Sequence, residues 1–234
     1  MKLYPFLVVP VAASLVVAAN YPAMAENDAV TTVESATQVF KEIMNDPKTR
    51  IPPEVLRSSQ GIAIIPNVIQ AGFFFGGRRG TGIVVVREEN GRWSNPAFLN
   101  LTGGSFGLQF GAKSSDIVLV FKDRNSIADV LKGGSFKLGG SASATAGPVG
   151  ASALDPTDAQ RKAGIYSYAR SEGLFAGVAL EGAEFGFNND KNQSLYGRQN
   201  ITVQQIFSNQ QIQPPSVVTN LKQVLNQFIS VISQ

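Results

Sequence analysis

The sequence predicts an α+β domain built on a coiled, largely antiparallel and partly closed β-sheet, with N-terminal, central and C-terminal helices. Three observations support this fold class. Short apolar runs bounded by Gly, Pro or Asn follow one another from Gly61 to Gly111, as strands and turns do. Of the 23 glycines, 22 lie between Gly61 and Gly186, which indicates bulges and sharp bends in the sheet. Helical periodicity appears before and after this region.

The first 25 residues resemble a secretory signal peptide. A lysine precedes the apolar run 6–19, and a small-x-small motif ends at Ala25. We expect cleavage after Ala25 and a single domain over residues 26–234. An uncleaved anchor is the competing interpretation, although the run is short for a bilayer span of about 20 residues. Cleavage would make the protein periplasmic or secreted. The chain has no cysteine, so an acyl-cysteine anchor is excluded.

Two helices are expected before the strands. Apolar residues recur at three- and four-residue steps over residues 28–46, where Thr31 and Glu34 could form a capping box. A second, short helix should begin at Pro53, a residue suited to the first helical position, and end near Ser59.

The strand region contains two distinct patterns. Phe106, Leu108 and Phe110 alternate with glycine and glutamine, which predicts a strand with one apolar face. The continuous run Ile83–Val86 predicts a strand covered on both sides. A turn is expected at residues 88–91, with a further strand over residues 116–122.

The second half of the chain predicts smaller elements. A helix through Ile127 and Leu131 would be capped by Asn125 or Ser126. The small-residue stretch 135–150 indicates a tightly packed strand pair, or else a backbone surface that a ligand can approach. Residues 165–170 and 173–181 read as a hairpin, which residues 184–187 could extend.

The C-terminal part is more helical. Residues 188–194 are expected to form a polar turn, and Thr202 to cap a short helix. A final helix begins at Ser216 and carries an apolar stripe. That stripe should dock on the sheet, the usual arrangement for an amphipathic helix.

The missing residue types restrict the chemistry. There is neither histidine nor cysteine, which removes histidine-based triads and the usual zinc or copper sites. The motif at Gly103–Gly107 matches a nucleophile elbow, but that motif needs a strand–turn–helix setting and a later histidine. A dyad of Ser105 with Lys113 stays formally open. We therefore predict a non-catalytic protein with no metal or cofactor.

Positive charge gathers in the strand region. Residues 58–113 hold five basic and two acidic residues, whereas residues 26–57 hold four basic and six acidic ones. Two adjacent arginines on a glycine-rich turn could bind anionic oxygens. The candidate headgroup-binding residues are Arg78, Arg79, Arg92 and Lys113. The near-balanced charge and the single tryptophan give little support to nucleic-acid binding.

Several motifs in fixed order resemble one family. They are GIAIIPNVIQAGFFFGGRRGTGIVVV, NLTGGSFGLQFG, SDIVLVF, LGGSASATAGPVG, GLFAGVALEG and SLYG, and the likeness covers roughly residues 51–207. This succession resembles the SYLF domain family, also called Ysc84-type lipid-binding domains. The resemblance implies a membrane-lipid-binding module rather than an enzyme. Eukaryotic members bind phosphoinositides with the help of a basic amphipathic N-terminal helix, whereas the corresponding region here is net acidic.

The expected function is therefore reversible binding of anionic phospholipid at a membrane surface in the bacterial cell envelope, with the protein peripheral to the membrane. The alternative is a structural or scaffolding envelope protein that binds a protein partner.

Overall fold

The computed structural model describes residues 21–47, 49–72, 75–106, 111–139, 143–149, 157–171, 174–176, 180, 182–208 and 212–230. The helices among them are α1 (Tyr21–Asn45), α2 (Pro53–Ser58), α3 (Ala128–Leu131), α4 (Asp158–Lys162), α5 (Asn189–Tyr196), α6 (Val203–Phe207) and α7 (Ser216–Ser230). The strands are β1 (Gly61–Gly72), β2 (Phe75–Val86), β3 (Ala97–Phe106), β4 (Gly111–Phe121), β5 (Phe136–Lys137), β6 (Ala144–Ala146), β7 (Ile165–Ser171), β8 (Leu174–Ala176) and β9 (Glu184–Phe187). The predicted α+β class is confirmed.

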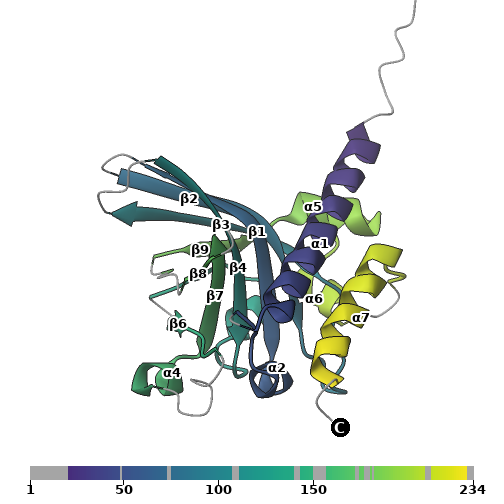
Figure 1. The fold of residues 1–234 in the computed structure, drawn as a ribbon. Coiled ribbons are helices and arrows are strands. Elements are labelled where there is room, and N and C mark those ends of the chain that lie inside the picture. Colours follow the sequence, from purple (N-terminus) through teal and green to yellow (C-terminus); the bar gives the residue numbers. More distant parts are fainter. Residues whose placement is uncertain are drawn as a thin grey trace, which may run out of the picture.

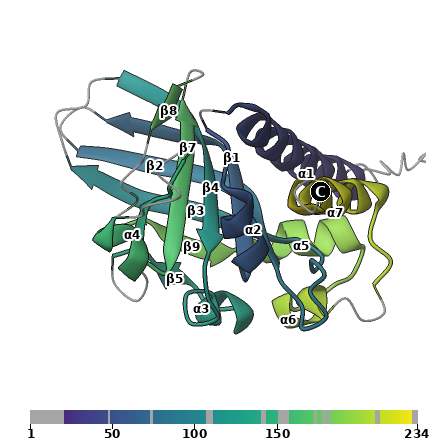
Figure 2. The ribbon, with the colours of Figure 1, turned by 60° about the horizontal axis from the view of Figure 1, so that its bottom comes forward.

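All nine described strands belong to one sheet, in the order β5-β9-β3-β2-β1-β4-β7-β6, with β8 paired to β7. Every pairing is antiparallel except that of β6 with β7. The four long strands β1 to β4 form its middle. At one end of these strands β1 leads to β2 and β3 leads to β4. Both ribbon views show this end extending away from α1 and α7 (Figures 1 and 2).

The sheet curls because β1 changes register. Its pairing with β4 shifts between Ile65 and Val68, which marks a bulge. The bulged backbone lies so close to β2 that a Cβ on Gly82 would be 2.2 Å from the carbonyl oxygen of Ile64. A Cβ on Gly80 would meet the side chains of Val68 and Ile65 at 2.8 and 2.9 Å. Glycine is therefore required where the strands approach, which confirms the predicted link between glycines and a coiled sheet.

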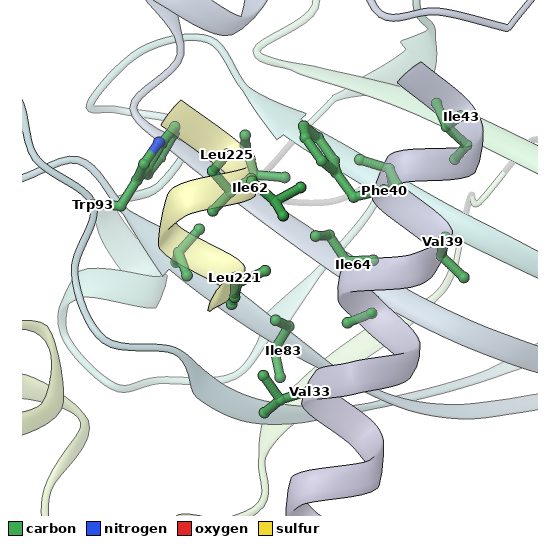
Figure 3. Close-up of a cluster of buried hydrophobic side chains, with 14 of the residues drawn as sticks. Val33, Val39, Phe40, Ile43, Ile62, Ile64, Ile83, Trp93, Leu221 and Leu225 are labelled. Atoms are coloured by element: carbon green, nitrogen blue, oxygen red, sulfur yellow. The ribbon is translucent and has the colours of Figure 1, made fainter. Parts of the chain in front are cut away.

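The two faces of the sheet bury separate cores. One face contributes Ile62, Ile64 and Ile83 to a cluster with α1 and α7 (Figure 3). The other face contributes Ala63, Ile65, Val84 and further residues to a cluster with α3 and α6. The uninterrupted apolar run of β2 is thus covered on both sides, as predicted.

Helix α1 docks along an apolar stripe at helical spacing. Its fully buried residues are Ala29, Val33, Ala36, Phe40 and Ile43. The helix begins at Tyr21, before the predicted start, so the proposed Thr31–Glu34 capping box is wrong. Thr31 instead donates its hydroxyl to the carbonyl of Asn27, inside the helix.

Helix α7 confirms the predicted docked stripe. Val218, Leu221 and Leu225 are fully buried, and Phe228 meets Phe40 of α1 edge to face at 5.9 Å. The two helices lie side by side over the same face of the sheet (Figure 1). Helix α2 begins with Pro53 as expected, and Thr202 caps α6 through a capping box.

Several smaller predictions are wrong. Residues 189–196 form a helix, capped by Asn188, in place of a polar turn. The strands in the small-residue stretch do not pair with each other, because β5 pairs with β9 and β6 with β7. Strand β9 pairs with β3 and does not extend the β7–β8 hairpin. The cap residue of α3 is Ile127, not Asn125 or Ser126.

Candidate functional site

Two of the predicted basic residues share one row of the sheet. Gln70 of β1 pairs with Arg78 of β2 on one side and with Lys113 of β4 on the other. Residues paired across antiparallel strands point to the same face, so the three side chains stand in line. Neighbouring strands are about 4.8 Å apart, which places the backbones of Arg78 and Lys113 about 10 Å apart.

Arg79 lies on the opposite face of the same strands. It pairs with Ile69 of β1 and with Thr102 of β3, and Ile69 pairs in turn with Ser114 of β4. Ile69 is 57% exposed, which is unusual for a large apolar side chain in a sheet. We call the two rows together the sheet-end surface, namely Arg78, Gln70 and Lys113 with Arg79, Ile69, Thr102 and Ser114.

The glycine-rich stretch at the two arginines is a strand and not the predicted turn. Because side chains alternate along a strand, adjacent Arg78 and Arg79 cannot bind one phosphate together from the same side. Glycine still has a role here. A Cβ on Gly103 would lie 3.4 Å from the Cγ of Arg78, so the missing side chain leaves room for the arginine stem. Burial lowers the pKa of Arg78 from its ordinary value, yet the group stays charged at neutral pH.

The charges around the sheet-end surface are mainly positive. Within the described part of the chain, neither Arg79 nor Lys113 makes an ion pair or side-chain hydrogen bond. The acidic residue on the row of Arg79 is Glu184, two strands away and paired with Lys137 of β5. Asp116 of β4 is already bound by Arg170, at 3.3 Å.

Arg92 lies elsewhere. It follows the opposite end of β2, roughly 25 Å along the strand from Arg78. Its side chain is 77% exposed and forms a long ion pair with Glu88 at 3.9 Å. The structure thus brings three of the four predicted basic residues to one end of the sheet and separates the fourth.

The geometry removes the serine–lysine dyad that the sequence left open. Ser105 lies inside β3, three strands from β4, which carries Lys113. Three strand spacings put the backbones of the two residues about 14 Å apart, which is too far for a serine–lysine dyad. Ser105 also lies within a strand, where a nucleophile elbow needs a turn into a helix.

Sequence reasoning missed Ile69 and Gln70. Their faces follow from the bulge in β1, which reverses the alternation after Ile65. The Pro66–Asn67 pair within an apolar run was the available signal, since proline inside a strand often marks a bulge, and Asn67 has a positive φ of 50°.

From Ala29 to Met44 the apolar side chains of helix α1 are buried in the core or, in the case of Val30, partly buried against it. Lys191 of α5 contacts the N-terminal half of α1, through an ion pair with Asp28 at 2.9 Å and a hydrogen bond to Thr32 at 2.8 Å. None of the helices in the described ranges combines the length and the apolar character that a membrane crossing needs.

Comparison with known proteins identifies the family. A family model described as "Ysc84: Las17-binding protein actin regulator" matches residues 102–228. "SH3 domain-containing YSC84-like protein 1" of Xenopus laevis is 33% identical over 198 residues, which cover 82% of this chain and 58% of the relative. "LAS seventeen-binding protein 3" of Saccharomyces cerevisiae is 37% identical over 177 residues, or 75% of this chain and 38% of the relative.

"SH3 domain-containing protein PJ696.02" of Schizosaccharomyces pombe is 38% identical over 181 residues, covering 76% of this chain and 41% of the relative. The chain therefore spans between about two fifths and three fifths of the length of these relatives. No solved structure matches the chain. The family match, with relatives above 30% identity over most of the chain, means that this protein belongs to the Ysc84 (SYLF) family.

Proposed function

We propose that this domain binds anionic phospholipid at a membrane surface through the sheet-end surface. The supporting observation is the placement of Arg78, Arg79 and Lys113 at the end of β1 to β4 that extends away from the helices. Exposed Ile69 lies between Arg79 and Ser114 and would contact the apolar boundary below the headgroups.

The strength of binding follows from the number of charges. A basic residue near an anionic membrane contributes about 1 kcal/mol, and the effect falls within a Debye length of about 8 Å at physiological salt. Three such residues give weak, reversible and salt-sensitive attachment. The proposal therefore describes a peripheral protein.

The proposed location is the periplasm or the outside of the cell, by cleavage after Ala25. Such cleavage would remove the first residues of α1 and keep its buried stripe, which starts at Ala29. Mass spectrometry of the protein recovered from producing cells tests this, and a mature chain that starts at Met1 would contradict it.

Co-sedimentation with vesicles tests the binding proposal. The wild type should pellet with vesicles containing phosphatidylglycerol, less so at high salt, and not with pure phosphatidylcholine. The double variant Arg79→Gln/Lys113→Gln should bind about 30-fold more weakly, since two charges of about 1 kcal/mol are lost. Both side chains are exposed, so the fold should be unaffected.

Arg57→Gln is the matched control. This exposed arginine lies in α2, which leads into the opposite end of β1. It removes one positive charge, half of what the double variant removes, and its binding should equal that of the wild type. A loss in the control of about half the binding free energy that the double variant loses would mean that only net charge matters. Equal pelleting with neutral and anionic vesicles would contradict the proposal.

A protein partner is the second candidate function. It is supported by the names of the relatives, one of which is a LAS seventeen-binding protein. If the same surface serves a protein, the wild type should retain a specific protein from envelope extract that the double variant does not. In that case neither form should pellet with anionic vesicles.

A further inference from the structure

A second basic site lies at the other end of the sheet. A pocket of about 390 Å³ separates the segment after β2 from helix α7. Arg92 and Lys222 line it from two segments far apart in the sequence, and Asn226 lies one turn after Lys222. Its volume is in the range of small-molecule sites.

The lining consists mainly of hydrogen-bond donors. Besides two cationic side chains, the lining includes the amides of Asn95 and Asn226 and the indole of Trp93. The Nε1–H of Trp93 is buried and has no acceptor among the described residues. The lining itself therefore offers an anionic ligand the two cationic groups of Arg92 and Lys222 and the amide N–H groups of the two asparagines. Trp93 lies beside the part of α7 that carries Leu225 (Figure 3).

The local charges also favour an anion. Glu88 is the nearby carboxylate and pairs with Arg92 at 3.9 Å, so it offsets one of the two positive charges. Burial, with Arg92 adding to it and Glu88 opposing it, lowers the pKa of Lys222 from its ordinary value. Glu88 acts on Lys222 more strongly than Arg92 does, so the two cations and this carboxylate together leave one net positive charge that an anion would neutralise.

We propose that this pocket binds a phosphate monoester group, with its oxygens between Arg92 and Lys222. Ile212 and Pro214 supply an apolar wall for the carbon portion of the ligand. The site is independent of the sheet-end surface, since it lies at the opposite end of β2. A phosphate group of this size could belong to a soluble metabolite or to a lipid headgroup.

The chain offers its own reporter, because Trp93 is its single tryptophan. We expect a saturable change in Trp93 fluorescence on titration with glycerol 3-phosphate, and none with chloride at the same ionic strength. Dihexanoyl phosphatidic acid, kept below its micelle concentration, separates the two sources. Tighter binding of this lipid points to a headgroup, and tighter binding of glycerol 3-phosphate points to a soluble ligand.

Asn226→Asp tests the placement. It adds a carboxylate to the pocket at an exposed position of α7 and should weaken binding at least about tenfold. Gln223→Asp adds the same charge at an exposed position outside the pocket lining and should bind like the wild type. The proposal is overturned if neither the fluorescence of Trp93 nor the melting temperature of the protein changes with glycerol 3-phosphate up to the solubility limit of that ligand. Identical titrations of Asn226→Asp and wild type would also overturn it.

Discussion

The guanidinium group of Arg170 in β7 donates a hydrogen bond to the carboxylate of Glu42 in α1. The same group contacts Asp116 of β4 at 3.3 Å. One arginine thus joins the N-terminal helix to two strands, next to the point where the sheet continues beyond the helix. Asp116 lies between Ser115 and Ile117, the partners of Val68 and Ile65, so the contact is at the bulge of β1.

This contact predicts an acid-sensitive contribution to stability. Hydrogen bonds from Gln38 and then Arg170, opposed by burial, lower the pKa of Glu42 below its ordinary value of 4.5. A lowered pKa stabilises the fold fully above about pH 4.5, and this stabilisation is lost as the pH falls through the folded-state value. At neutral pH, Glu42→Gln should therefore reduce the free energy of unfolding by up to about 1 kcal/mol.

Urea unfolding of wild type and Glu42→Gln across the acid range measures this. The difference between the two should shrink as the pH falls below 4.5. Glu34→Gln, an exposed position on α1, is the control and should show no such trend. A constant difference between wild type and Glu42→Gln at all pH values would contradict the assignment.

Alanine should destabilise the fold at one glycine of β2 and leave stability unchanged at another. Gly82→Ala would place a Cβ 2.2 Å from the Ile64 carbonyl oxygen, so the β1 bulge would have to move. We expect a loss of about 3 kcal/mol, or failure to fold. Gly77→Ala meets nothing within 4 Å and should be neutral. Urea midpoints of the two variants provide the comparison, and similar values would refute the role of Gly82 in the curl.

Asn192 should anchor α5 to the sheet. It is fully buried, and its Oδ1 accepts a hydrogen bond from the backbone N–H of Phe98 at 2.8 Å. Asn192→Leu leaves that buried donor without a partner and should cost about 1–3 kcal/mol in the free energy of unfolding. Asn189→Ala, exposed on the same helix, should cost less. Thermal unfolding distinguishes them, and equal melting temperatures would show that the bond contributes nothing.

The sequence predicted those features whose cause is local. The apolar periodicity of α1 and α7, Pro53 at the start of α2 and the Thr202 cap are all set by residues within a few positions. The glycine-rich strands likewise predicted a coiled sheet. The predicted strand with Phe106, Leu108 and Phe110 on one face cannot be compared in full, because residues 107–110 lie outside the described residues.

Long-range features could not be predicted in the same way. Residues 189–196 are polar on the whole, and they form a helix because Asn192 and Leu195 have buried places on the sheet. The arrangement of the candidate site residues depends on the register of the paired strands, which the sequence does not show. Strand pairing decides which face of the sheet Arg78 and Arg79 each occupy. Arg92 is separated from both because it follows the far end of the long strand β2.

The most direct test of the account maps which part of the protein touches the membrane. The chain has no cysteine, so a single engineered one can carry an environment-sensitive fluorophore. Ser114→Cys lies in the sheet-end surface and Ser58→Cys in α2, and both positions are exposed. With anionic vesicles we predict a blue shift for the label at residue 114 and no shift at residue 58. A shift at residue 58 alone, or at neither position while the protein is bound, would contradict membrane contact through the sheet end.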